Sequence, residues 1–159
     1  MEINLIQALS NRLYYADGRL ISKVTGKLAD SYINNWGYRR VSWDRGASGR
    51  VREYAHRLVW YMFNGQIPDG LMIDHIDLDK SNNRIENLRL ITKSGNSQNS
   101  KRKGYFWDTR ANKWRSQIKI DGKTIHLGFF TEEQTARATY LEAKRLLHPM
   151  ASIHVLTNN

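Results

Sequence analysis

The chain has 159 residues with 40% apolar and 25% charged residues, no cysteine, and a formal net charge of +10. This composition is typical of a globular protein, and the length allows one ordinary domain or two small ones. Without cysteine, disulfides and thiolate zinc sites are excluded, and no apolar run approaches a membrane span, so we expect a cytoplasmic protein with no membrane partner.

The positive charge is divided unevenly along the chain. Residues 1–55 carry +4, residues 56–92 carry −1, and residues 93–159 carry +7. Two basic segments around a slightly acidic centre suit a protein that binds a polyanion at both ends and holds a cation in the middle. Nucleic acid is therefore the leading partner. The alternative is chance, because basic small domains are common.

The first part of the chain is predicted to form hairpins and then a short helix. Short β-prone runs between residues 13 and 43 alternate with the turn signals Asp17-Gly18, Thr25-Gly26 and Trp36-Gly37. The run "REYAHRLVWYMFNG" changes to helical spacing and stops at Gly65. Its apolar side is expected to hold Ala55, Leu58, Val59, Met62 and Phe63.

The segment "GLMIDHIDLDKSNNRIENLRLIT" places polar groups directly after an apolar strand, Leu71 to Ile73. A polar loop follows, then a second strand from Leu88 to Thr92 and a segment that begins as a helix. Hydrolysis of a phosphodiester needs a base and a cation. His75 is the side chain best able to act as a base near neutral pH, and Asp74 is a hard oxygen ligand for magnesium or manganese. A structural hydrogen-bonded pair is the alternative for these two residues.

The tail is predicted to form a separate module. Residues 104–130 contain three strand-like runs, and the Asp121-Gly122 pair is a strong hairpin signal. A helix follows over residues 131–148, opening with Thr131 and Gln134 in capping-box spacing. The fold class is therefore α+β. We expect an N-terminal strand-rich, DNA-contacting region over 1–55, a β, loop, β, α unit over 56–100, a three-stranded module with one helix over 101–150, and a tail over 151–159.

Strand alternation predicts two different faces for the sheet of the tail. One face is expected to point to the core and holds Trp114, Ile118, Ile120, Ile125, Leu127 and Phe129. The other face holds Arg115, Gln117, Lys119, Thr124 and His126. A basic and polar sheet face fits a DNA groove, where Arg and Gln can read base edges, although a merely solvated strand would show the same pattern.

Residues 56–99 resemble the HNH endonucleases of the ββα-metal (His-Me finger) class found in phage and intron-homing enzymes. The resemblance rests on the Asp-His pair, the "NN" and "ENLR" loop, and an asparagine nine residues after Asn87. It implies that His75 is the general base, that Asp74 and Asn96 ligate Mg²⁺ or Mn²⁺, and that Asn87 holds the loop and orients the base. Many family members have histidine where this chain has Asn96, so the resulting all-oxygen site favours magnesium or manganese over zinc.

The tail from Gly104 resembles the AP2 DNA-binding domain through "KWRSQIKIDGKTIHLGFF" followed by a helix rich in alanine and aromatic residues. Together the resemblances predict a metal-dependent homing-type endonuclease that acts on double-stranded DNA as a monomer, without a small-molecule cofactor, in a host cell if it is phage-encoded. The alternatives are a non-catalytic DNA-binding regulator that retains the fold, and a non-specific nuclease.

Further contacts to DNA are expected from basic and polar side chains in both parts. His56 is a secondary candidate for contact with the cleaved phosphate, and Asn99 for packing or phosphate contact. Asn82 and Asn83 are interpreted as turn formers. The predicted DNA-binding residues are Arg57, Lys101, Arg102, Lys103, Arg115, Gln117, Lys119, Thr124 and His126.

Overall fold

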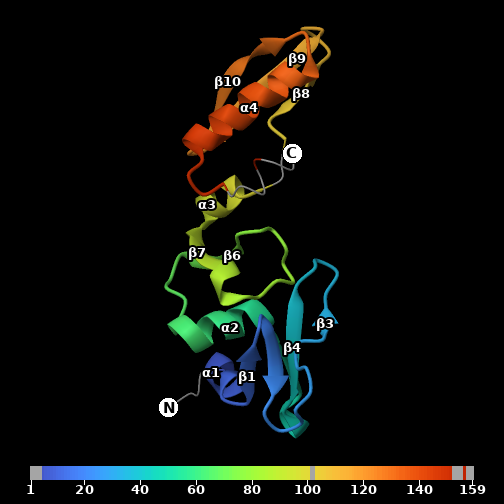
Figure 1. Cartoon of the computed structure of the whole chain (residues 1–159), viewed down its shortest axis with the longest axis vertical. Helices are drawn as coiled ribbons and strands as arrows, with labels where there is room; N and C mark the ends of the chain where they lie inside the picture. The colour runs from blue at the N-terminus through green and yellow to red at the C-terminus, as the bar shows by residue number, and fades with distance from the viewer. Residues whose placement is uncertain (1–4, 101–102, 152–155, 157–159) are drawn as a thin grey trace. The chain divides into compact units, whose positions relative to one another are not determined.

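The computed structural model describes residues 5–100, 103–151 and 156, and it divides into two compact units, residues 1–91 and 92–159. Each unit combines helices with small sheets (Figure 1). None of the helices in the described ranges is long and apolar enough to cross a membrane.

The first unit contains three small sheets and two helices. Its elements are α1 (Leu5–Ser10), β1 (Leu13–Ala16), β2 (Arg19–Ser22), β3 (Tyr32–Ile33), β4 (Arg39–Asp44), β5 (Arg50–Tyr54), α2 (Ala55–Asn64), β6 (Leu71–His75) and β7 (Leu88–Thr92), with short 3-10 turns at Gly46–Ser48 and Ile85–Asn87. Strands β1 and β2 form one sheet, β3, β4 and β5 a second, and β6 and β7 a third.

The predicted hairpin at Asp17-Gly18 is confirmed. Both residues have positive φ, 47° for Asp17 and 80° for Gly18, and they connect the antiparallel strands β1 and β2. Positive φ at both central positions is the geometry of the tight turns whose twist matches paired strands. The helix α1 carries no such local signal and was not predicted.

Helix α2 lies at the centre of the core of the first unit. Ala55, Leu58 and Val59 are fully buried, and they pack with Leu9, Leu13, Leu20, Val41 and Leu88. The helix ends at Gly65 (φ 76°), as predicted. Because this core combines residues from both sides of position 55, the strand-rich region and the following helix fold as one unit.

The apolar side predicted for α2 is wrong at one position. Phe63 is 53% exposed, and its ring meets the ring of Tyr15 edge-on at 5.0 Å. The segment from Arg52 to Tyr54 belongs to β5 instead of the helix.

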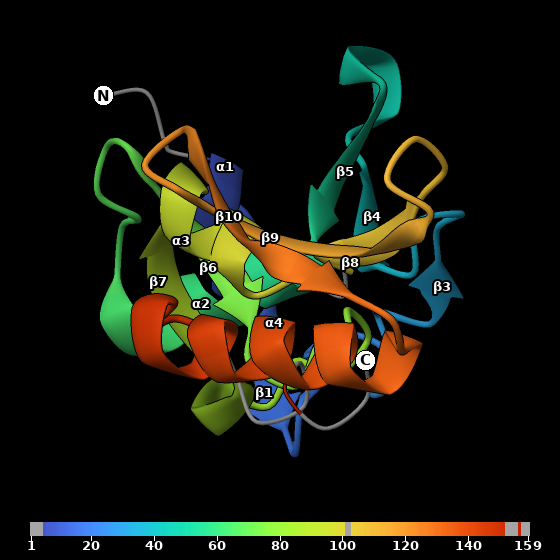
Figure 2. The same ribbon diagram turned by 90° about the horizontal axis from the view of Figure 1, so that it is seen from above.

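The second unit consists of α3 (Lys93–Gln98), β8 (Tyr105–Asp108), β9 (Lys113–Ile120), β10 (Lys123–Phe130) and α4 (Glu133–Leu147). The strands form an antiparallel sheet in the order β10-β9-β8, and α4 covers one of its faces (Figure 2). The core between them holds Tyr105, Ile118, Ala136 and Tyr140. The three strands and the helix were predicted.

The predicted capping box of α4 is wrong. Glu132 has an extended backbone and is the N-cap residue, with no side-chain capping bond. Thr131 therefore lies one residue before the position from which its hydroxyl could cap the helix.

A bulge in β10 changes which aromatic ring enters the core. The register shifts between His126 and Gly128, so Phe129 pairs with Arg115 and Phe130 pairs with Trp114. Phe130 packs against the core, whereas Phe129 is 44% exposed on the opposite face. The prediction that Phe129 faces the core is wrong, because one extra residue reverses the alternation.

Candidate active site

The end of β6 brings Asp74 and His75 together in the interior of the first unit, with 6% and 4% exposure. Arg89, on the neighbouring strand β7, directs two guanidinium nitrogens to Oδ2 of Asp74, Nε at 3.0 Å and Nη2 at 2.9 Å. Charge-assisted hydrogen bonds from a guanidinium fix the orientation of a buried carboxylate. The pair of strands therefore holds the Asp74 carboxylate in a fixed position.

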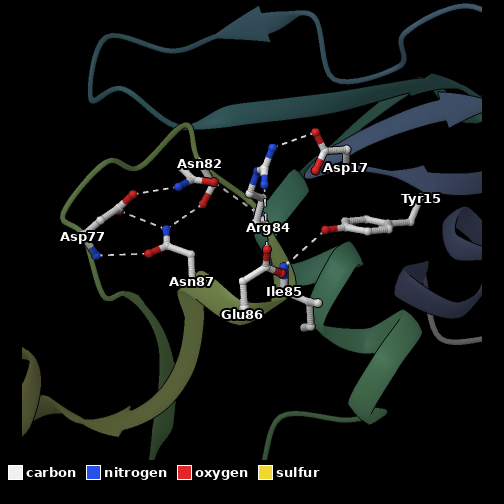
Figure 3. A network of polar contacts seen from close by, with 8 residues as sticks. All are labelled: Tyr15, Asp17, Asp77, Asn82, Arg84, Ile85, Glu86 and Asn87. Carbon is white, nitrogen blue, oxygen red and sulfur yellow. Dashed lines mark hydrogen bonds and ion pairs between the residues drawn. The ribbon is translucent and has the colours of Figure 1, made fainter.

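The loop between these strands is closed by the side chain of Asn87. Its Oδ1 accepts from the backbone N–H of Asp77 at 3.0 Å, and its Nδ2 donates to Oδ1 of Asp77 and to the carbonyl of Asn82, both at 2.9 Å (Figure 3). Asn82 in turn donates to Oδ2 of Asp77 at 2.7 Å. These are the contacts that a loop-holding role for Asn87 requires.

Asn83 contacts His75 directly. The Oδ1 of Asn83 lies 3.0 Å from Nε2 of His75, and Asn83 is only 1% exposed. An amide oxygen only accepts hydrogen bonds, so Nε2 carries the proton in this arrangement and the lone pair lies on Nδ1. Asn83 was predicted to form a turn, but its side chain points inward, whereas the side chain of the neighbouring Asn82 reaches Asp77. Two adjacent asparagines after an Asp-His pair are the only local signal for this contact.

Aromatic rings form a wall around His75. The ring of His56, from α2, meets the ring of His75 edge-on at 5.2 Å, and the ring of Tyr38 lies 6.0 Å away. Tyr54 stacks on His56 at 5.4 Å. Burial is the main cause that lowers the pKa of His56 to about 3, and the neighbouring His75 and Arg57 add to the shift, so the imidazole of His56 stays neutral.

An open hollow of about 450 Å³ adjoins this wall. It is lined by Tyr38, Tyr54, His56, Arg57 and residues 67–73. Nδ1 of His56 is buried and has no hydrogen-bond partner within the described residues. Arg57 is exposed at the surface and pairs with Glu53 at 3.4 Å, so it is accessible for the predicted DNA contact.

The remaining predicted site residues lie in the second unit. Asn96 is exposed on α3, and Asn99 is the buried C-cap residue of that helix. Lys103 is exposed, with its Nζ 5.5 Å from the centre of the Tyr105 ring. Lys101 and Arg102 lie outside the described residues. The pairing of Asn96 with Asp74 at a metal ion stays a prediction.

Asp74 offers the type of oxygen ligand that magnesium-type ions prefer. In the described ranges no three His, Asp or Glu side chains converge as a ligand cluster. Mg²⁺ is usually bound by one or two carboxylates and completes its shell with water and substrate phosphates. The buried Asp74 carboxylate is one ligand of this kind.

The face of the second unit's sheet away from α4 gathers the predicted DNA-binding side chains. Strand pairing sets Thr124 beside Lys119 and His126 beside Gln117. Arg115 lies between Phe106 on β8 and Phe129 on β10, and Phe129 reaches this face because of the bulge in β10. Its guanidinium carbon is 6.0 Å from the centre of the Phe129 ring, and its Nη1 is 3.8 Å from Oδ2 of Asp108.

Comparison with known proteins identifies the family. A family model described as HNH endonuclease matches residues 53–98. The HNH endonuclease L560 of Acanthamoeba polyphaga mimivirus is 30% identical over 146 residues, which cover 84% of this chain and 78% of L560. The chain belongs to the HNH endonuclease family.

Other relatives of this HNH protein come from phages. DNA endonuclease I-HmuI of Bacillus phage SP01 is 34% identical over 87 residues, covering 55% of this chain and 49% of I-HmuI. Protein 3.8 of Escherichia phage T7 is 38% identical over 76 residues, covering 43% of this chain and 63% of that protein. The matched regions therefore span about half to two thirds of these relatives.

A solved structure describing DNA binding and cleavage by the HNH homing endonuclease I-HmuI superposes on this chain with a TM-score of 0.52 and 26% identity. The match covers 86% of this chain and 81% of that one. The likeness therefore extends well beyond the HNH motif itself.

The buried His56 of the HNH unit predicts a specific acid sensitivity. Its pKa is lowered from 6.5 to about 3 in the folded protein, so below pH 6.5 the unfolded chain binds a proton that the folded chain does not. The free energy of unfolding should therefore fall as the pH drops, with a slope approaching about 1.4 kcal/mol per pH unit. Denaturant unfolding between about pH 5 and 6.5 measures this slope.

His56→Gln should flatten the slope, because it removes the histidine whose pKa is lowered by burial. Equal slopes for wild type and His56→Gln would contradict the assignment of a neutral buried His56.

Proposed function

We propose that this HNH protein is a metal-dependent DNA endonuclease that hydrolyses phosphodiester bonds, with a DNA-binding second unit of the AP2 type. The observation that carries the proposal is the buried pair at the end of β6. His75 is tied at Nε2 to Asn83, and the Asp74 carboxylate beside it is held by Arg89. The names of the relatives, DNA endonuclease and HNH homing endonuclease I-HmuI, support DNA as the substrate.

In the proposed reaction each residue of the site has a separate task. His75 takes a proton from the attacking water through Nδ1, the nitrogen left with a lone pair by the contact with Asn83. Asp74 and Asn96 would hold Mg²⁺ or Mn²⁺, which when bound neutralises charge on the phosphate and the leaving oxygen. Asn87 keeps the loop closed, and the neutral ring of His56 packs against His75 without adding a charge.

The second unit is proposed to bind DNA through the face of its sheet that α4 does not cover. Arg115 is flanked by two phenyl rings and tethered by Asp108, so its guanidinium loses little freedom on binding. Such a side chain can bond a guanine edge with two hydrogen bonds, and exposed phenyl rings can contact thymine methyl groups. With one catalytic site in the chain, a monomer would cut one strand in each binding event.

The first test concerns His75 and the metal. His75→Ala should lower single-turnover cleavage by about 10²- to 10⁴-fold and leave DNA affinity nearly unchanged, because a general base contributes to rate and adds little to phosphate binding. Cleavage should also require a divalent ion, and Asp74→Ala should raise the concentration needed. A plasmid digest with Mg²⁺, Mn²⁺ or excess EDTA measures both effects.

Full activity in EDTA would contradict the metal-dependent mechanism. Binding without cleavage in either metal would support the regulator, and degradation to short fragments would support a non-specific nuclease.

The second test concerns the contact between Asn83 and His75. Asn83→Ala should lower the single-turnover rate by about 10- to 100-fold, the range typical for partners that orient a functional histidine. Asn83→Asp should retain most activity at about pH 8.5, where imidazole is neutral, because a carboxylate oxygen also accepts a hydrogen bond. Asn82→Ala is the matched control, because this neighbouring asparagine bonds to Asp77.

A double-mutant cycle separates positioning from a general loosening of the loop. If Asn83 acts through His75, Asn83→Ala should have no further effect on cleavage in a chain that already carries His75→Ala. An equal loss in both backgrounds would mean that Asn83 works independently of the base.

The third test concerns the sheet face of the second unit. Arg115→Ala should weaken DNA binding, and it should reduce the slope of log K against log salt by about 0.9 if the guanidinium contacts one phosphate. If it reads a base edge, the loss should concentrate at particular base pairs. Arg145→Ala removes the same charge from α4, where Arg145 is exposed and paired with Glu142, and should leave affinity unchanged. Equal effects of both changes would show that only net charge matters.

A further inference from the structure

Three large apolar side chains are exposed around the turn between β3 and β4. Trp36 is 69% exposed, Tyr32 57% and Ile33 44%. Single exposed apolar residues are common on protein surfaces, whereas several large exposed apolar side chains in one short segment can mark a binding surface. Trp36 is the most exposed aromatic residue among those described.

The turn that carries Trp36 is stiff. Asn34 is 8% exposed, and its Oδ1 accepts from the backbone N–H groups of both Trp36 and Tyr38 at 3.0 Å. Backbone bonds from Asn34 to Tyr38 and from Gly37 to Asn34, each 2.9 Å, close the turn, and Gly37 has φ 87°. An aromatic ring on a preformed turn loses little entropy when it binds.

The same turn is attached to the loop of the candidate active site. Nε of Arg39 donates to the carbonyl of Ser81 at 3.1 Å, and the Nζ of Lys80 lies 4.9 Å from the centre of the Tyr38 ring. The ring of Tyr38 is 6.0 Å from that of His75. The β3–β4 turn and the loop after β6 therefore lie side by side in the first unit (Figure 1).

The proposed catalytic side chains are buried, so we expect the DNA to be distorted when it binds. His75 is 4% exposed and Asp74 6%, so a phosphate in an undisturbed duplex has little access to them. Proteins that insert an apolar side chain between base steps unstack them and bend the duplex, which widens a groove and exposes the backbone.

We propose that Trp36 inserts into DNA beside the cleaved phosphate and stacks on a nucleobase, which opens the duplex toward His75. DNA is favoured over a protein partner because Lys80 and Arg39 adjoin the turn and residues 1–55 carry +4. The assignment rests on the proposed endonuclease function.

The test uses the full chain and the DNA sequence at which the wild-type protein cuts a mapped plasmid. Trp36→Ala should weaken DNA binding and slow cleavage at limiting protein by about 5- to 100-fold, the range for the loss of one base–aromatic stacking interaction. Trp36→Phe should recover most of this loss. Val24→Ala is the matched control, because Val24 is a 75% exposed apolar residue in a different turn of the same unit.

A second measurement reports insertion directly. With 2-aminopurine in the strand opposite the cleaved phosphate, at a base that loses its stacked neighbour without gaining the Trp36 ring, fluorescence should rise when a chain carrying His75→Ala binds. A chain that carries both His75→Ala and Trp36→Ala should show no rise in fluorescence, even when saturating protein is used. A rise that persists, or affinity and cleavage equal to wild type for Trp36→Ala, would overturn the proposal.

Two outcomes separate this inference from the proposed function. If the wild-type protein binds DNA but does not cut it with Mg²⁺ or Mn²⁺, the endonuclease proposal fails, while the DNA affinities of Trp36→Ala and Val24→Ala still decide whether Trp36 contacts DNA. If Trp36→Ala instead abolishes a concentration-dependent self-association seen by sedimentation and leaves DNA binding intact, the surface joins two copies of the chain and the DNA proposal is wrong.

Discussion

Nε2 of His75 and Oδ1 of Asn83 meet 3.0 Å apart in the interior of the first unit, and both side chains are almost fully buried. Nδ2 of Asn83 has no hydrogen-bond partner within the described residues, a loss of about 1–3 kcal/mol for a buried polar group. The contact with His75 is therefore the side-chain hydrogen bond that Asn83 makes among the described residues, and the loop that carries Asn83 is closed by the bonds of Asn87 to Asp77.

The proposed catalytic residues lie in the first unit, whereas the second unit carries the larger share of the positive charge. The first unit surrounds His75 with a core shared by α2 and the N-terminal strands, so residues outside the HNH motif determine how rigid the site is. The second unit has its own core beneath a sheet whose uncovered face is basic and aromatic. Because the cores are separate, substitutions on that face should leave the surroundings of Asp74 and His75 undisturbed, and in the proposed function they would change DNA recognition alone. This arrangement would allow target preference to change while the catalytic unit stays the same.

Local signals in the sequence predicted the elements that depend on local geometry. The Asp17-Gly18 hairpin, the end of α2 at Gly65 and the three strands with α4 all follow from turn residues and hydrophobic spacing. The sequence did not reveal the bulge that turns Phe129 outward, because one unpaired residue leaves no trace in an alternating pattern. The inward direction of Asn83 was missed for a related reason. It depends on the loop being closed by Asn87 and on the contact with His75, eight residues earlier. Neither contact follows from a repeating pattern of apolar and polar residues.

The most direct measurement is the tautomer of His75 in the intact protein. Long-range ¹H–¹⁵N correlation spectra of the histidine rings at about pH 8.5, where imidazole is neutral, distinguish a proton on Nε2 from one on Nδ1, and His75→Gln assigns the signals. We expect His75 to be held in the Nε2–H form, and we expect Asn83→Ala to leave a mixture of the two forms. A dominant Nδ1–H form in the wild-type protein, or a tautomer unchanged by Asn83→Ala, would contradict the claim that Asn83 prepares His75 to accept a proton at Nδ1.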